Sequence, residues 1–74
     1  DPWPERFDAM AAVDALRTLG AHHQAALTLR YIDDLPVGEV ARLLHRTEQA
    51  TEALLARART ALRRAYEKGG EDAH

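Results

Sequence analysis

The chain has 74 residues, a formal net charge of −2 and no cysteine, which excludes a disulfide scaffold and a thiolate metal site. A chain of this length forms one small domain without room for an enclosed catalytic cavity. Its hydrophobic residues make up 46% of the chain and are mostly Ala and Leu, a balance that favours helices over strands.

The charge is divided unevenly along the chain. Residues 1–41 carry three Arg and seven acidic residues, a balance of −4. Residues 42–68 carry six Arg and one Lys against three Glu, a balance of +4. The second half is therefore where a polyanion would bind.

The first seven residues read as an extended lead-in, because two prolines stand within four positions. Trp3 and Phe7 are available there to dock on the helical body. Since the chain begins with Asp1 rather than Met, we take it for a piece of a longer protein, and residues 1–7 for the end of a linker.

Two helices are predicted next from apolar residues that recur at helical spacing. The first covers about residues 8–19 and would end at Gly20. The second covers about residues 21–32. Their apolar residues are Val13, Leu16 and Leu19 in the first helix, and Ala25, Leu29 and Ile32 in the second, with Leu27 and Tyr31 beside them.

Residues 33–36 break the second helix, because the residue before Pro36 is disfavoured in the helical region. Pro36 also suits the first turn of a short third helix over residues 37–44, with Val40, Leu43 and Leu44 as its apolar side. Residues 45–47 then form a turn. His45 lies where positive φ is common and His is enriched, although a merely tolerated turn residue would look the same.

A long fourth helix follows, with Thr47 as its N-cap. At about 100° per residue, its buried stripe is Thr51, Leu55, Ala58 and Leu62. The opposite face is small and polar, with Gln49, Ala53, Ala56 and Thr60 flanked by Arg57 and Arg64. The sequence thus predicts an all-α domain of four helices over residues 8–67 and a flexible, frayed tail over residues 68–74.

Catalysis is not expected, because the chain has no Ser and no Cys, and its five Thr and two Tyr lack a recognisable base. Asp33 and Asp34 read as solvated turn residues. His22 and His23 would point about 100° apart, unlike the i, i+4 zinc spacing. We therefore expect neither a metal nor a cofactor. No apolar run approaches the roughly 18 residues of a membrane span, so we expect a cytoplasmic protein without membrane contact.

Residues 39–59, EVARLLHRTEQATEALLARAR, have the spacing of a helix, a tight turn and a second helix. A capped helix with a buried stripe and an outward face of small residues suits a DNA groove about 12 Å wide. An ordinary helical hairpin with a solvated basic face would share this pattern, and the residues alone leave both interpretations open.

The chain resembles region 4, the C-terminal promoter-reading domain, of bacterial sigma factors, in particular the extracytoplasmic-function group. The resemblance covers about residues 10–65. Residues 27–44, LTLRYIDDLPVGEVARLL, resemble the family's apolar helix, acidic turn and Glu-(Ile/Val)-Ala opening of the helix-turn-helix. Residues 54–64, LLARARTALRR, resemble its Arg-Ala-Arg run.

The resemblance implies that the fourth helix enters the major groove of the minus-35 promoter element. It also implies that the flap of core RNA polymerase is a partner and that an anti-sigma protein is a candidate third partner. Two alternatives stay open, a helix-turn-helix output domain of another transcription regulator and a helical module that binds only protein.

The chain departs from the family pattern at two places. His45 stands where the family often has Gly, and residues 52–54, Glu-Ala-Leu, replace a basic-Ser-Arg triplet. Arg57 matches the first Arg of Arg-Ala-Arg and is the strongest base-contact candidate. We expect DNA contacts from nine residues: Arg46, Thr47, Gln49, Glu52, Ala53, Ala56, Arg57, Thr60 and Arg64.

Glu48 and Glu52 place carboxylates near the start of this reading helix. Carboxylates in the first turns of a helix interact favourably with its positive end, by about 0.3–1 kcal/mol. Alternatively, a groove-facing Glu accepts a hydrogen bond from the exocyclic amine of cytosine. Leu54, near the rim of the buried stripe, is expected to pack against the second helix or a partner.

Overall fold

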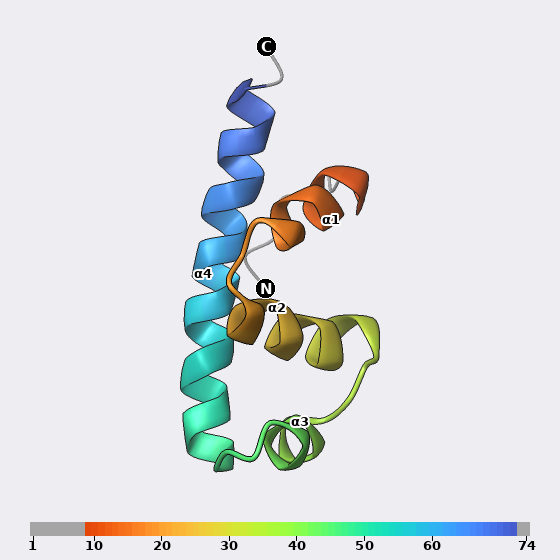
Figure 1. The fold of residues 1–74 in the computed structure, drawn as a ribbon, viewed down its shortest axis with the longest axis vertical. Coiled ribbons are helices and arrows are strands. Elements are labelled where there is room, and N and C mark those ends of the chain that lie inside the picture. The colour runs from red at the N-terminus through yellow and green to blue at the C-terminus, as the bar shows by residue number, and fades with distance from the viewer. Residues whose placement is uncertain (1–8, 73–74) are drawn as a thin grey trace.

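The computed structural model of the chain describes residues 9–72 (Figure 1). It is all-helical over this range, with α1 (Ala9–Arg17), α2 (Ala21–Leu27), a π-helical turn η1 (Thr28–Ile32), α3 (Val37–Leu43) and α4 (Glu48–Asp72). The expected four-helix fold with a long last helix is confirmed. The expected docking of Trp3 and Phe7 lies outside the described residues.

The 25-residue helix α4 forms the long axis of the molecule. The shorter helices lie along one side of it, with α3 beside its N-terminal end and α1 nearer its C-terminal end (Figure 1). Each of α1, α2 and α3 packs against α4. The opposite side of α4 is therefore left for solvent or a ligand.

The core is a cluster along the inward side of α4. Its buried members are Ala15, Ala26, Leu27, Leu54, Leu55, Ala58 and Leu62. All four residues of the predicted stripe of α4 are buried, which confirms the helical phase. The one polar member of that stripe, Thr51, is satisfied because its hydroxyl donates a 2.8 Å hydrogen bond to the carbonyl oxygen of Thr47.

The predicted apolar sides of the three shorter helices are partly wrong. Val13, Ile32 and Leu43 are exposed, Ile32 by 64%. Leu27 in α2 and Val40 in α3 are buried, in agreement with their expected apolar positions, whereas Ala15 in α1, Ala26 in α2 and Ala41 in α3 are buried without having been predicted. The three unpredicted positions are all alanines, whose small side chains contribute little to a pattern read from larger apolar residues.

The π-helical turn explains the error in the second helix. The backbone N–H of Asp33 donates to the carbonyl oxygen of Thr28 at 2.9 Å, a bond that spans five residues. Such a turn holds more residues than an α-helical turn, so positions after Leu27 rotate away from the direction that a 3.6-residue period predicts. Ile32 consequently faces solvent.

Helix boundaries also differ from the sequence expectation. α1 ends at Arg17, and Gly20 is the N-cap of α2 in an extended conformation, with φ −62° and ψ 159°. α4 continues to Asp72, beyond the expected limit at residue 67, and passes through Gly69 and Gly70. Glycine costs about 1 kcal/mol in a helix relative to Ala but does not forbid one.

Although α4 is long, no helix among the described residues is apolar enough to cross a bilayer.

Candidate nucleic-acid interface

The turn between α3 and α4 begins with two hydrogen bonds that close the end of α3. The N–H of Arg46 donates to the carbonyl oxygen of Ala41 at 2.9 Å, and the N–H of His45 donates to that of Arg42 at 3.2 Å. This pair of bonds is a Schellman motif, which requires a left-handed residue after the helix. His45 supplies it with φ 57°, so the expectation of positive φ at His45 is confirmed.

Thr47 begins α4 as predicted. Its Oγ1 accepts a 3.0 Å hydrogen bond from the N–H of Ala50, which satisfies one of the free donors at the helix start. With the turn bonds, this cap fixes the direction in which α4 leaves α3. The two helices therefore form a helix-turn-helix of defined geometry.

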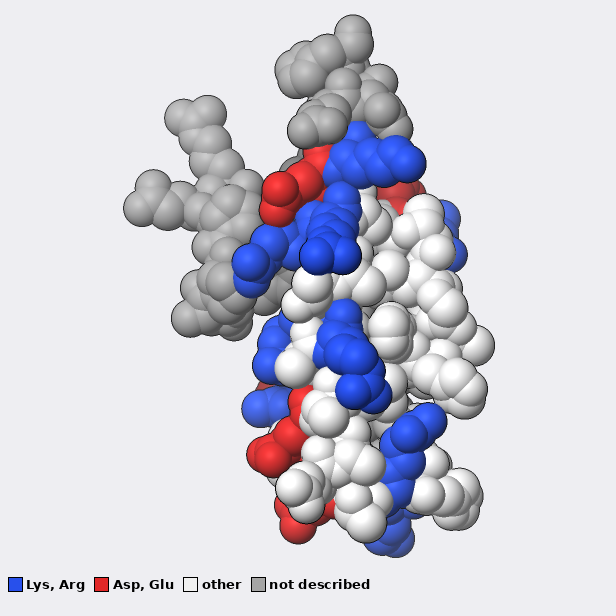
Figure 2. Space-filling model, turned by 90° about the vertical axis from the view of Figure 1, so that its left-hand side faces the viewer, with Lys and Arg blue, Asp and Glu red and all other residues white. Residues whose placement is uncertain are grey.

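The outward face of α4 and the preceding turn carry the nine candidate DNA-contacting residues. All nine are exposed: Arg46, Thr47, Gln49, Glu52, Ala53, Ala56, Arg57, Thr60 and Arg64. Figure 2 shows basic side chains along the length of this side of the molecule, with acidic ones mainly at its left-hand margin. Exposure and charge are thus compatible with a polyanion.

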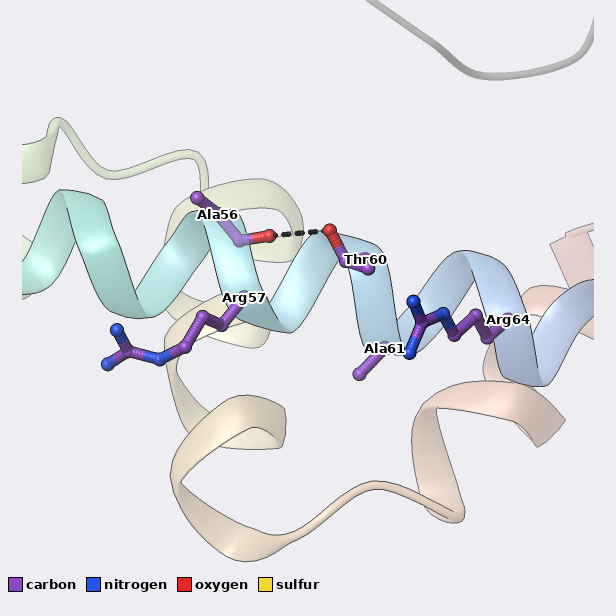
Figure 3. Close-up of a pocket in the computed structure, with 5 residues that line it drawn as sticks. All are labelled: Ala56, Arg57, Thr60, Ala61 and Arg64. Atoms are coloured by element: carbon purple, nitrogen blue, oxygen red, sulfur yellow. Dashed lines mark hydrogen bonds between the residues drawn. The ribbon is translucent and has the colours of Figure 1, made fainter.

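Arg57 and Arg64 border an open hollow on α4 that is also lined by Ala56, Thr60 and Ala61 (Figure 3). Both arginine side chains extend along the helix toward its N-terminal end, as side chains on a helix generally do (Figure 3). The Thr60 hydroxyl donates to the carbonyl oxygen of Ala56 at 3.1 Å. The other residues that line the hollow, Ala56, Thr60 and Ala61, have short uncharged side chains, and a guanidinium group extends along each half of it.

A central strip of Gln49, Ala53, Ala56 and Thr60 runs along this face, and it is called the reading strip below. Three of its four side chains are short, so the backbone of α4 can approach base edges closely. At about 100° per residue, Arg57 and Arg64 lie on one edge of the strip.

The residues on the second edge of the reading strip were not predicted from the sequence. By the same helical arithmetic, Arg59 and Arg63 lie on the side opposite Arg57. Both are half-buried rather than fully exposed. The signal in the sequence is their angular position between the buried stripe and the outward face of a regular helix.

Glu48 lies against the start of α3 rather than over the reading strip. A methyl group built on Gly38, in the first turn of α3, would lie 3.2 Å from Oε1 of Glu48. The carboxylate thus lies near the positive ends of both α3 and α4. Its position favours the helix-end interpretation for Glu48, whereas Glu52 is exposed and has no recorded partner among residues 9–72.

Leu54 belongs to the core and not to its rim. Its side chain is 4% exposed and shares a cluster with Ala26 and Leu27 of α2. Its position therefore agrees with the expectation that Leu54 packs against the second helix.

The first helix of the motif carries an ion pair on its surface. The guanidinium of Arg42 binds the carboxylate of Glu39 one turn earlier, and this contact raises the pKa of Arg42. Among the described residues, no group of three His, Cys, Asp or Glu side chains is placed to hold a metal ion.

The chain was compared with protein families, curated proteins and solved structures. A family model described as "Sigma-70, region 4" matches residues 9–62, a range that contains all four α-helix starts, the whole reading strip and its edge residues Arg57 and Arg59. No curated protein matched, and no solved structure matched.

Proposed function

The chain belongs to the sigma-70 region 4 family, and from that membership we propose that it recognises the minus-35 element of a promoter through the exposed face of α4. Membership implies promoter recognition and an RNA polymerase partner in general. The proposal adds which DNA element is read and which residues read it.

The observation that carries the proposal is the composition of the reading strip and its edges. A helix can enter a major groove about 12 Å wide only if the side chains that face the bases leave it room. The strip meets this need with two alanines and two small or medium polar residues. The guanidinium of Arg57 extends from its edge, where it can donate two hydrogen bonds to O6 and N7 of guanine.

The turn supplies contacts of another kind. Arg46 is exposed beside His45 and directly precedes the N-cap. A charge at that position would meet the phosphate backbone as α4 enters the groove, and phosphate contacts fix register without reading sequence. Arg46 is therefore proposed as a phosphate contact, and Arg57 as a base contact.

The protein partners are proposed from family membership. The flap of core RNA polymerase would hold the domain on the promoter, and an anti-sigma protein is a candidate inhibitor that would cover the same surface. Exposed apolar side chains on η1 and α3, among them Ile32 and Leu43, are compatible with a protein contact away from the reading strip.

The test compares Arg57→Ala with Arg46→Ala on a duplex that the chain selects from a randomised pool and on all its single-base variants. Arg57→Ala should cost about 1–3 kcal/mol and relax preference at one position. Arg46→Ala should weaken every duplex alike and reduce the log-log salt slope by about one unit.

Two outcomes would count against the proposal. If Arg57→Ala weakened all variants equally, Arg57 would be only a phosphate contact and the reading face would be wrongly assigned. If the unmodified chain showed no salt-dependent affinity for any duplex, it would instead be a module that binds only protein.

A further inference from the structure

Arg59, on the second edge of the reading strip, is held in place by another part of the fold. Its Nη1 donates a 3.0 Å hydrogen bond to Oη of Tyr31, 28 positions earlier in the chain. Tyr31 belongs to η1 and is 44% exposed. The bond therefore fixes the direction of a cationic side chain at the surface of the molecule.

A second arginine completes the cluster. The guanidinium carbon of Arg30 lies 5.5 Å from the centroid of the Tyr31 ring, within the range of a cation–π interaction. Nη1 of Arg30 also donates to the carbonyl oxygen of Leu35 at 3.3 Å. Within residues 9–72, neither Arg30 nor Arg59 is paired with a carboxylate. Two positive charges thus surround one tyrosine without a neutralising acid.

The position of Arg59 on α4 relates this cluster to the reading strip. Arg57 and Arg59 are two residues apart, so they point about 160° apart around the helix, with the strip between them. A helix in the major groove has a phosphate strand on each of its two sides. The Arg57 edge faces one strand, and the Arg59 edge faces the other.

We propose that Arg59, positioned by Tyr31 and supported by the charge of Arg30, binds a phosphate of the DNA strand opposite the Arg57 edge. The inference rests on the function proposed above and adds the residues that hold the second strand. It also assigns a role to the π-helical turn, which presents Tyr31 to α4.

Tyr31 acts as a positioning residue in this proposal. An arginine side chain has large rotamer freedom, and ordering it on binding opposes affinity. The hydroxyl of Tyr31 orders the Arg59 guanidinium before DNA arrives. Because a guanidinium has five N–H donors, one bond to Tyr31 leaves others for phosphate oxygens.

The experiment measures the dissociation constant of the chain for its selected duplex as a function of salt, between about 50 and 200 mM. The variants are Arg59→Ala, Arg59→Lys and Tyr31→Phe. Arg17→Ala is the matched control, because Arg17 is an exposed arginine on α1, beside Met10 and Val13 rather than on α4. Circular dichroism melts establish that each variant is folded.

Arg59→Ala should reduce the log-log salt slope by about 0.9 and weaken all single-base variants equally. Arg59→Lys and Tyr31→Phe should keep the slope and lower affinity by about two- to tenfold, the cost of ordering one side chain during binding. Arg17→Ala should change neither quantity.

Different failures have different meanings. A slope for Arg59→Ala equal to that of Arg17→Ala, in a chain that otherwise binds DNA, would overturn this inference and leave the proposed function standing. Unchanged affinity in Tyr31→Phe would overturn the positioning role. Absence of salt-dependent binding in the unmodified chain would overturn the proposed function and this inference with it.

Discussion

Glu48 and Glu52 lie about one helical turn apart at the start of α4, yet their surroundings differ. Oε1 of Glu48 is close enough to Gly38 to contact a methyl group placed there, so this carboxylate faces the N-terminal turns of two helices. Glu52 is exposed beside the reading strip. The position of the first carboxylate therefore favours a role in stabilising the helix ends, whereas the second is placed where it would repel a polyanion bound to the reading strip.

Substitution by Gln separates these two effects. Glu48→Gln should lower the free energy of unfolding by about 0.3–1 kcal/mol, because it removes a charge that favours the helix ends. Glu52→Gln should leave stability almost unchanged and raise affinity for every duplex by less than about tenfold, since it removes a repulsion from phosphate. Thermal melts and duplex titrations measure the two quantities.

The result that would reverse the interpretation of Glu52 is a change in base preference. If Glu52→Gln left overall affinity similar but broadened the choice at a single C·G pair, the carboxylate would be accepting a hydrogen bond from cytosine. A loss of stability as large as that in Glu48→Gln would instead assign Glu52 to the helix end.

Ala53 and Leu54 are consecutive residues of α4, but the side chain of Leu54 is buried and that of Ala53 is exposed. Leu54→Arg should cost several kcal/mol, a large share of the 5–15 kcal/mol that stabilises a typical domain, because it buries a charge without a partner. Ala53→Arg, the matched control, should change stability by no more than about 0.5 kcal/mol. Denaturant melts that showed the two variants to be equally stable would contradict the position of Leu54 in the core.

At the scale of residues, the sequence was most informative where periodicity applies to a long regular helix. Thr51, Leu55 and Ala58 were all placed correctly inside. Leu54 was misjudged because a stripe about 60° wide is narrower than the surface that three packed helices cover. The Tyr31–Arg59 bond could not be predicted, since it joins two side chains whose relation depends on the angle between two helices.

At the scale of elements, α2 begins without a side-chain cap. Gly20 is its N-cap and provides no side-chain hydrogen bond. A Cβ added there would meet no other atom within 4 Å. Its φ of −62° and ψ of 159° suit any L-residue, so glycine is not required by the backbone.

Gly20→Asp should therefore stabilise the domain by about 0.5–1 kcal/mol, because it adds a cap and restricts the unfolded chain. The melting temperature should rise by about 2–8 °C for a domain of this size. Gly20→Ala restricts the unfolded chain without capping, and Ala is a poor N-cap. An equal rise in both variants would show that the cap contributes nothing.

The elements themselves were predictable to different degrees. Prolines, caps and apolar spacing identified four helices and the turn after α3, including the left-handed residue at its centre. The π-helical turn η1 was not predictable from spacing, because a local change of period depends on how Leu27 and the residues after it pack. The end of α4 was predicted too early because residues 68–74 were expected to fray, whereas neither a proline nor a left-handed residue ends the helix before Asp72.

At the scale of the whole molecule, one helix organises everything else. Helix α4 spans about 37 Å at 1.5 Å per residue, which accounts for most of the 41 Å length of a molecule only 22 Å by 17 Å across. Its inward side contacts the three shorter helices and its outward side bears the reading strip. The described acidic residues of the first half, Asp14, Asp33, Asp34 and Glu39, lie on or between the helices that pack against the inward side of α4. Four arginines of the second half, Arg57, Arg59, Arg63 and Arg64, border the reading strip.

We propose that the outward face of α4 contacts promoter DNA. The most direct measurement is a map of backbone amide chemical shifts as the chain is titrated with its selected duplex. We expect the largest changes at His45 and Arg46 in the turn and at the exposed positions of α4 from Gln49 to Arg64, with α1 little affected. Changes concentrated on α1 and α2, or no changes at a salt concentration low enough for phosphate contacts to form, would contradict it.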